Sequence, residues 1–247
     1  MPDAAPNPEL LRSLGRLARG LSALFWGLPA ALIVCAGTAS AGWFGSYGIV
    51  PPLAVTGLLF FGIWQLGSFQ KQERPWQNAL HWARFFALVN FGLSPFLYWW
   101  NRLPEKPFFG IMIGMLAVSA LFFLFSLNRV VLRLGAMLPD ETLRLETRHY
   151  TALNRTLLTA LLMLGVFYLF FSAILPLYLS LPSNLPAHLI ALPSEWEFRF
   201  PFGLRINGAW LVWLLGCVLA LLPLAMTMAL IWKTKEIILD SVFGGQR

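Results

Sequence analysis

Charged side chains are scarce in this sequence. Asp, Glu, Lys and Arg together make up 12% of its 247 residues, whereas apolar residues make up 58%. A soluble domain usually contains about 25% charged residues, so this chain carries too few to cover the surface of a globule in water. The composition therefore excludes an ordinary soluble domain and indicates a protein whose surface is solvated mainly by lipid.

Residues that hold metals or perform catalysis are also few. The three histidines are scattered, and Cys35 and Cys217 lie in separate apolar stretches without a metal-ligand spacing. No nucleotide-binding glycine loop, HExxH or GxSxG motif occurs. We therefore expect no catalytic residues, no metal ion and no cofactor.

Six apolar stretches are each long enough to cross a bilayer core, which takes about 20 residues. They cover roughly residues 21–38, 50–69, 80–100, 107–127, 157–181 and 208–232. None of them contains an acidic residue, which weighs against proton-coupled transport because buried ionisable groups usually carry the protons. The predicted fold class is an all-α integral membrane protein, with a six-helix transmembrane bundle in residues 21–247.

Arginine and lysine orient the predicted bundle, because cytoplasmic loops of membrane proteins are enriched in both. With a cytoplasmic N-terminus, the outer loops carry only four of the 18 Lys and Arg residues: Arg102, Lys106, Arg199 and Arg205. If residues 80–100 did not cross, the split would become 10 inside against 8 outside. We therefore predict a multi-pass protein of a bacterial-type plasma (inner) membrane with both termini in the cytoplasm. The net charge of +7 then favours anionic lipid headgroups as partners and not nucleic acid.

Residues 1–20 are predicted to form a cytoplasmic amphipathic helix on the inner leaflet. Leucines at positions 10, 14, 17 and 21 share one face, and Arg12, Arg16 and Arg19 project from the other. A competing interpretation is a cleavable signal peptide, because three arginines precede an apolar run that ends in the motif ASA at residues 39–41. Cleavage after that motif would leave five spans.

Two longer segments are predicted to lie outside the membrane. Residues 128–155 continue helical spacing past the fourth span and predict a short cytoplasmic helical hairpin, where a soluble partner could dock. On the other side, the external loop 182–207 alternates between polar and apolar residues from Glu195 to Ile206, which is typical of a strand. Pro and Gly near its middle predict a small periplasmic β-hairpin.

Interfacial residues mark the predicted ends of the third span. Arg84 lies about 12 Å along a helix that begins near Trp76, so we expect it to anchor at the inner headgroup region beside that tryptophan. The alternative is a buried cation with a functional role. Trp99 and Trp100 are expected at the outer interface, where aromatic rings are enriched. With Arg12, Arg16 and Arg19, Arg84 is predicted to contact lipid headgroups.

Asn90 and Ser94 are polar residues that lie deeper in the same span, on one helical stripe. Two interpretations stay open. Small and amide side chains often join membrane helices, but the stripe could also line a substrate pathway. Gln65, in the cytoplasmic half of the second span, has the same ambiguity.

Small residues line one face of two other spans. Gly27 and Ala31 do so in the first span, and Gly110 and Gly114 form a GxxxG pair in the fourth. Such faces allow helix backbones to approach closely. They predict tight packing within the bundle or against another chain.

Three functions follow from these patterns. The leading hypothesis is a non-enzymatic subunit or scaffold component of a membrane complex, with lipids, other membrane subunits or a cytoplasmic protein at 128–155 as partners. The second is a small-molecule permease whose pathway passes Gln65, Asn90 and Ser94. The third is a membrane-embedded lipid-modifying enzyme, which would need a cluster of catalytic side chains that the sequence does not display.

Overall fold

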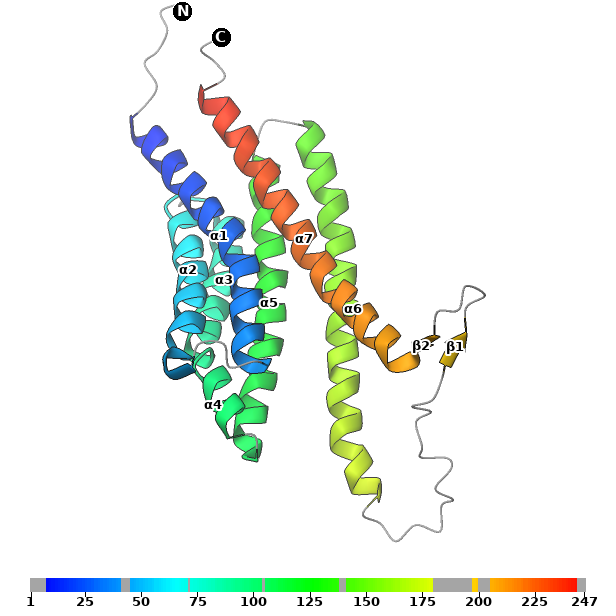
Figure 1. Cartoon of the computed structure of the whole chain (residues 1–247). Helices are drawn as coiled ribbons and strands as arrows, with labels where there is room; N and C mark the ends of the chain where they lie inside the picture. The colour runs from blue at the N-terminus through cyan, green and yellow to red at the C-terminus, as the bar shows by residue number, and fades with distance from the viewer. Residues whose placement is uncertain are drawn as a thin grey trace, which may run out of the picture. The chain divides into compact units, whose positions relative to one another are not determined.

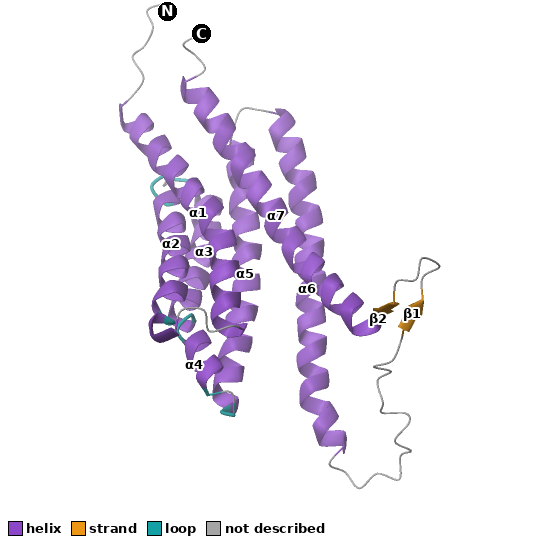
Figure 2. Ribbon diagram, viewed as in Figure 1, coloured by secondary structure: helices purple, strands orange, loops and turns teal. Residues whose placement is uncertain are grey.

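The computed structural model describes residues 8–40, 45–70, 72–103, 105–137, 141–179, 197–199 and 205–243. Most of these residues are helical (Figure 1, Figure 2). The helices are α1 (Pro8–Ser40), α2 (Val50–Leu66), α3 (Arg74–Leu93), α4 (Phe96–Arg102), α5 (Pro107–Met137), α6 (Glu141–Leu179) and α7 (Gly208–Phe243), with a 3-10 turn at Gly45–Tyr47.

Four of the described helices contain a segment long and apolar enough to cross a membrane. The segments are Arg12–Ser40 in α1, Pro107–Met137 in α5, Arg144–Phe167 in α6 and Val218–Leu239 in α7. These helices indicate a helical membrane protein. Helix α2 is apolar but has only 17 residues, and α3 and α4 are separate helices, so the count of six spans stays a prediction.

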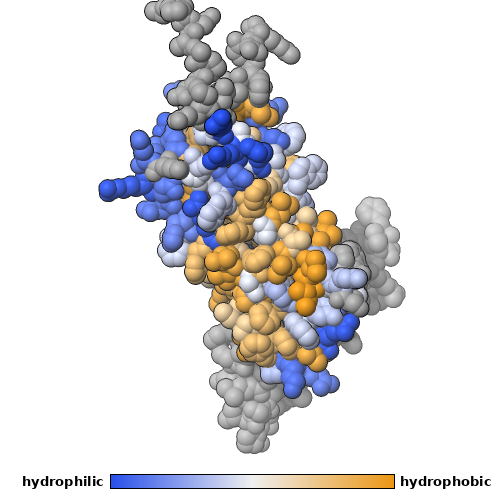
Figure 3. Space-filling view, turned by 90° about the vertical axis from the view of Figure 1, so that its left-hand side faces the viewer, coloured by the Kyte–Doolittle hydropathy of each residue, from blue (hydrophilic) through white to orange (hydrophobic). Residues whose placement is uncertain are grey.

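Hydrophobic and hydrophilic residues are segregated on the molecular surface. On the face drawn in Figure 3, hydrophobic residues gather in the middle and hydrophilic residues gather toward both ends. Large apolar side chains such as Trp26, Phe61 and Ile111 are exposed. Hydrocarbon is the medium that tolerates such a surface, because exposed apolar area of this extent is rare on monomers in water.

Helix α1 is continuous from Pro8 to Ser40. The sequence predicts an amphipathic helix in residues 1–20 and a separate span from residue 21, but the structure has no break there. Leu17 and Leu21 are fully buried, so this part of the leucine face packs on protein and does not lie on lipid. The apolar face of the N-terminal part and that of the span thus form one stripe.

Pro95 separates α3 from α4. The sequence predicts a single span through residues 80–100, but α3 ends at Leu93 and α4 begins at Phe96. The backbone N–H of Ser94 still bonds to the carbonyl oxygen of Asn90 at 2.9 Å. Pro95 has no N–H with which to continue this ladder.

The chain divides into two compact units, Met1–Arg155 with Leu224–Arg247, and Thr156–Pro223. In the first unit, α1 packs on α2, α2 on α3, and α3 on α5. Backbones of α1 and α2 approach each other closely at Gly20, where an added Cβ would lie 2.8 Å from the carbonyl oxygen of Gly62. The fully buried core around this contact includes Leu17, Leu21, Leu24, Ile63, Leu66, Trp76, Leu80, Leu127 and Leu134.

The second unit contains most of α6, the first part of α7 and two short strands. Strand β1 (Glu197–Arg199) pairs antiparallel with β2 (Arg205–Asn207), with Phe198 opposite Ile206. Both strands belong to the stretch whose alternation predicts a hairpin. The rest of the predicted external loop lies outside the described residues, and its periplasmic location stays a prediction.

Candidate functional site: a cavity lined by Asn90

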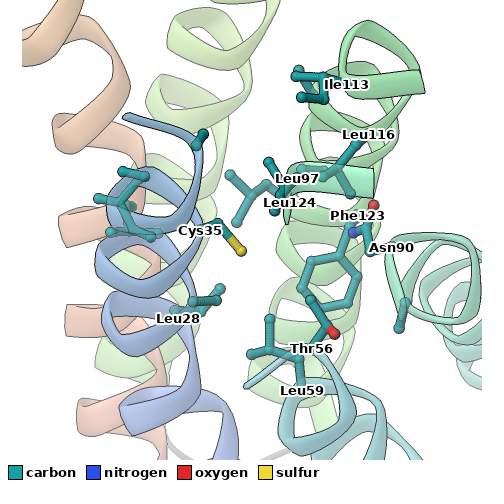
Figure 4. Close-up of a pocket in the computed structure, with 18 residues that line it drawn as sticks. Leu28, Cys35, Thr56, Leu59, Asn90, Leu97, Ile113, Leu116, Phe123 and Leu124 are labelled. Carbon is teal, nitrogen blue, oxygen red and sulfur yellow. The ribbon is translucent and has the colours of Figure 1, made fainter. Parts of the chain in front are cut away.

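A cavity of about 380 Å³ lies among the helices of the first unit (Figure 4). Its wall is almost entirely apolar, because α1 and α5 contribute leucines and alanines to it. The alanines make the space, since larger side chains at the same positions would fill it. The lining includes Leu28, Ala31, Leu32, Cys35, Ala36 and Ala39 of α1, Thr56 and Leu59 of α2, Ala87 and Asn90 of α3, and Ile113, Leu116, Ala117, Ala120, Phe123 and Leu124 of α5.

Two hydroxyl groups near the cavity are satisfied by their own helices. Thr56 donates to the carbonyl oxygen of Pro52 at 2.7 Å, and Ser94 donates to that of Phe91 at 2.9 Å. The two hydroxyl oxygens lie 3.2 Å apart, and both side chains are buried. Thr56 and Ser94 therefore join α2 to the end of α3. This arrangement is the usual polar packing of membrane helices.

Asn90 is the exception among these polar groups. Its side chain is only 6% exposed, and its Oδ1 atom is buried without a hydrogen-bond partner. Figure 4 shows Asn90 near Phe123, across the cavity from Cys35 of α1. A buried amide oxygen without a partner costs about 1–3 kcal/mol, so its place on a cavity wall is the most informative feature of the site.

Gln65 lies in a different place. It lines a second cavity, of about 490 Å³, which shares no residue with the Asn90 cavity. Between Thr56, which lines the Asn90 cavity, and Gln65, helix α2 carries the buried residues Leu59 and Ile63, and the buried Leu66 follows Gln65. The three residues predicted to line one pathway are thus divided: Asn90 and Ser94 are near each other, and Gln65 is apart.

Arginines gather around this second cavity. Arg84 lies over the ring of Trp64, 5.3 Å from its centroid, and its Nε atom is buried without a partner. Arg16 lines the same cavity, and it also lines a neighbouring one of about 550 Å³ with Arg12 and Arg19. The four arginines predicted to meet lipid headgroups therefore lie at one end of the first unit.

The aromatic residues predicted at the interfaces differ in their surroundings. Trp99 is exposed, whereas Trp100 lies against Gly110, where an added Cβ would approach its ring to 3.1 Å. Trp76 is fully buried, and its Nε1 donates to the carbonyl oxygen of Phe69 at 3.0 Å. Trp76 is therefore a core residue, and not a ring in the headgroup layer.

The small residues also differ. An added Cβ at Gly27 would lie 2.8 Å from Leu59, so this glycine permits the contact between α1 and α2. Ala31 lines the Asn90 cavity. Gly114 has nothing within 4 Å of an added Cβ, so within the described structure the face with Gly110 and Gly114 packs closely only at Gly110.

A polar cluster between α5, α6 and α7 was not expected from the sequence. Asn154 donates to Thr227 at 2.9 Å and to Asn128 at 3.4 Å, and Asn128 donates to the carbonyl oxygen of Thr151 at 2.9 Å. All four residues are buried. Asn128, Thr151 and Asn154 belong to residues 128–155, which the sequence predicts to face water, whereas Thr227 belongs to the predicted span 208–232. The stripe of Thr147, Thr151 and Asn154 at helical spacing is the signal that indicates a buried face.

Among the side chains that the structure describes, no group of three His, Cys, Asp or Glu residues could hold a metal ion. The described part of the chain does form an apolar cavity with an unpaired amide oxygen on its wall. Three of the helices that line it, α1, α5 and α7, contain segments long and apolar enough to cross a membrane. No family model, curated protein or solved structure matches the chain.

Proposed function

We propose that this protein is a non-enzymatic subunit or accessory component of a membrane complex. The observation that carries the proposal is an exposed leucine in a charged part of α6. Leu145 is 70% exposed and lies among Arg144, Glu146 and Arg148, which are exposed too. Charged neighbours require water or headgroups, so Leu145 and the nearby exposed Leu153 place apolar area in a hydrated zone, where a contact with another protein would cover it.

The rest of this segment supports the same proposal. Thr147 and Thr151 are buried on the side of α6 that faces α5, where Thr147 lies about 3.1 Å from an added Cβ at Gly135. Leu145 and Leu153 lie on the opposite side of the helix, and both are exposed. This leucine face is therefore available to a cytoplasmic protein or to another subunit.

The proposal includes six spans, cytoplasmic termini and a bacterial-type inner membrane. The four arginines at one end of the first unit support this orientation, because arginines favour the anionic inner leaflet. Trp99 and Arg102 are at the far end of the predicted third span, and Arg102 lies over the ring of Tyr98, 5.0 Å from its centroid. Anionic lipid headgroups at the arginine end are the lipid partners that we propose.

A small-molecule permease is the second candidate, and the observation that favours it is the unpaired Oδ1 of Asn90 on a cavity wall. A pathway would have to continue to Gln65, which lines a separate cavity. Transport therefore requires a second conformation with a different packing of Ile63 and Leu66. Radiolabelled solute that enters proteoliposomes only when they contain the protein would establish this alternative in place of the first.

Replacement of Leu145 by Glu tests the subunit proposal. The protein is extracted in mild detergent from the membrane in which it naturally occurs, and its native mass is measured. We expect the wild-type chain to travel with a stoichiometric second polypeptide, and Leu145→Glu to lose it because a carboxylate is placed in an apolar contact.

Arg129→Gln is the matched control, since it also lowers the net charge by one at an exposed position of the same predicted segment. It should retain the companion. A wild-type chain that travels as a lone monomer would contradict the proposal, and so would a companion that survives Leu145→Glu unchanged.

A further inference from the structure

The Asn90 cavity combines a hydrocarbon wall with one buried hydrogen-bonding group. Of the 18 residues that line it, only Cys35, Thr56 and Asn90 are polar. The Thr56 hydroxyl is bonded to its own helix, and a thiol is a weak hydrogen-bonding group. The amide of Asn90 is therefore the one strong polar group of the described wall that has no partner for its oxygen.

The size of the cavity limits what it can hold. A cavity of about 150 Å³ accommodates benzene, so 380 Å³ has room for roughly 12 to 15 carbon atoms by the same scale. The volume also falls within the range of small-molecule sites, about 300–1,000 Å³. A single hydrocarbon chain or a small ring system fits, whereas a complete two-chain phospholipid does not.

The Asn90 amide decides the chemistry of the occupant. Its Oδ1 atom accepts a hydrogen bond and its Nδ2 group donates, so a hydroxyl group matches both roles. Hydrocarbon alone would leave the amide unpaired. We propose that this cavity is a binding site for an apolar chain or ring that carries one hydroxyl group, with that hydroxyl bonded to Asn90.

This inference goes beyond the proposed subunit function and does not rest on it. Loss of the companion in Leu145→Glu concerns α6, whereas the cavity is lined by α1, α2, α3, α4, α5 and Leu224 of α7. Each experiment can fail while the other succeeds.

Photolabelling in lipid nanodiscs tests the site. The probes are a 12-carbon alcohol that carries a diazirine and the matched 12-carbon alkane that carries the same group without the hydroxyl. We expect the alcohol to label the cavity segments of α1 and α5 about fivefold more than the alkane, which is the factor that one net hydrogen bond gives. Peptide mass mapping locates the adducts.

Three variants make the test specific. Asn90→Leu should remove the preference for the alcohol and keep alkane labelling. Ala120→Phe should reduce labelling by both probes severalfold, because a phenyl ring fills the space. Ser119→Ala is the matched control: its hydroxyl is also buried without a partner, but Ser119 does not line the cavity, so the preference should remain.

Equal labelling by alcohol and alkane in the wild-type chain would overturn the proposal. So would a preference that survives Asn90→Leu, or labelling that ignores Ala120→Phe. A monodisperse elution profile of each variant shows that it has folded, and any variant that fails this criterion is replaced by Asn90→Val or Ala120→Leu, for which the same results are expected.

Discussion

Substitution of Gly20 by Leu should destabilise the protein by about 3 kcal/mol. The backbones of α1 and α2 touch at this residue: a Cβ would lie 2.8 Å from the carbonyl oxygen of Gly62 and 3.1 Å from the Cβ of Gln65. A backbone oxygen cannot turn aside as a side chain can, so the two helices would have to move apart. In lipid this separation is costly, because close packing is the main attraction between membrane helices.

Gly15→Leu is the matched control for this prediction. Gly15 lies in the same helix, is exposed, and has nothing within 4 Å of an added Cβ. Leu has the higher helix propensity by somewhat less than 1 kcal/mol, so Gly15→Leu should be neutral or slightly stabilising. The measurement is the temperature at which half of the heated protein no longer elutes as a monodisperse peak. We expect a decrease of about 10 °C for Gly20→Leu, and equal values for the two variants would show that α1 and α2 do not pack at Gly20.

Substitution of Trp76 by Ala should cost about 3–5 kcal/mol, the usual range for a buried tryptophan. The indole is fully buried in the core of the first unit, and it packs edge-on against Phe69 with ring centroids 6.3 Å apart. It also donates a hydrogen bond to the carbonyl oxygen of Phe69. Both the packing and the hydrogen bond hold the end of α2 to the start of α3.

Trp82→Ala is the matched control: it also removes a tryptophan from α3, but Trp82 is 53% exposed. A difference between the two variants therefore reports the burial of Trp76 and not the loss of an indole as such. Its loss should cost less than about 1 kcal/mol by the same reasoning. Trp76→Phe keeps most of the packing and removes the hydrogen bond, for about 1 kcal/mol. The thermal assay used for Gly20 ranks the three variants. If Trp82→Ala were as damaging as Trp76→Ala, the placement of Trp76 in the core would be wrong.

The apolar helices could be predicted from the sequence because their hydrophobicity is a local property. Each of the six predicted stretches overlaps a helix of the structure, and four of these helices are long and apolar enough to cross a membrane. Helix ends were less predictable. Whether Pro95 bends a helix or ends it depends on how the neighbouring helices satisfy the freed backbone groups, and the sequence alone does not contain that information.

Burial of single residues was the other feature that the sequence could not supply. Trp76 and Trp82 lie in the same helix, yet only Trp76 is buried in the core. Asn90 and Gln65 have the same ambiguity in the sequence, but they line different cavities. The contact of Asn154 could not be predicted, because its partner Thr227 lies 73 residues away in the chain. These distinctions arise from which helix faces meet, and that is a long-range property.

The distribution of polar groups explains the two kinds of site. Where polar groups meet between helices, as at Thr56 with Ser94 or at Asn128 with Asn154, they bond to one another or to helix carbonyls. Such contacts stabilise the packing by modest amounts. Asn90 lines a cavity and its Oδ1 has no hydrogen-bond partner. Thr56 lines the same cavity but is bonded, and Asn154, whose Oδ1 also has no partner, does not line it. The combination of both features is the physical reason to assign binding to Asn90 and packing to the others.

Cysteine accessibility along α5 tests most directly that lipid is the medium of this chain. In a chain whose two native cysteines are replaced by alanine, single cysteines are placed at Lys106, Met115 and Ala136 and treated with a membrane-impermeant maleimide. The account predicts that Lys106→Cys reacts in intact spheroplasts, that Ala136→Cys reacts only after permeabilisation, and that Met115→Cys, although 52% exposed, reacts in neither. Reaction of Met115→Cys in water, or reaction of both end positions from the same side, would contradict it.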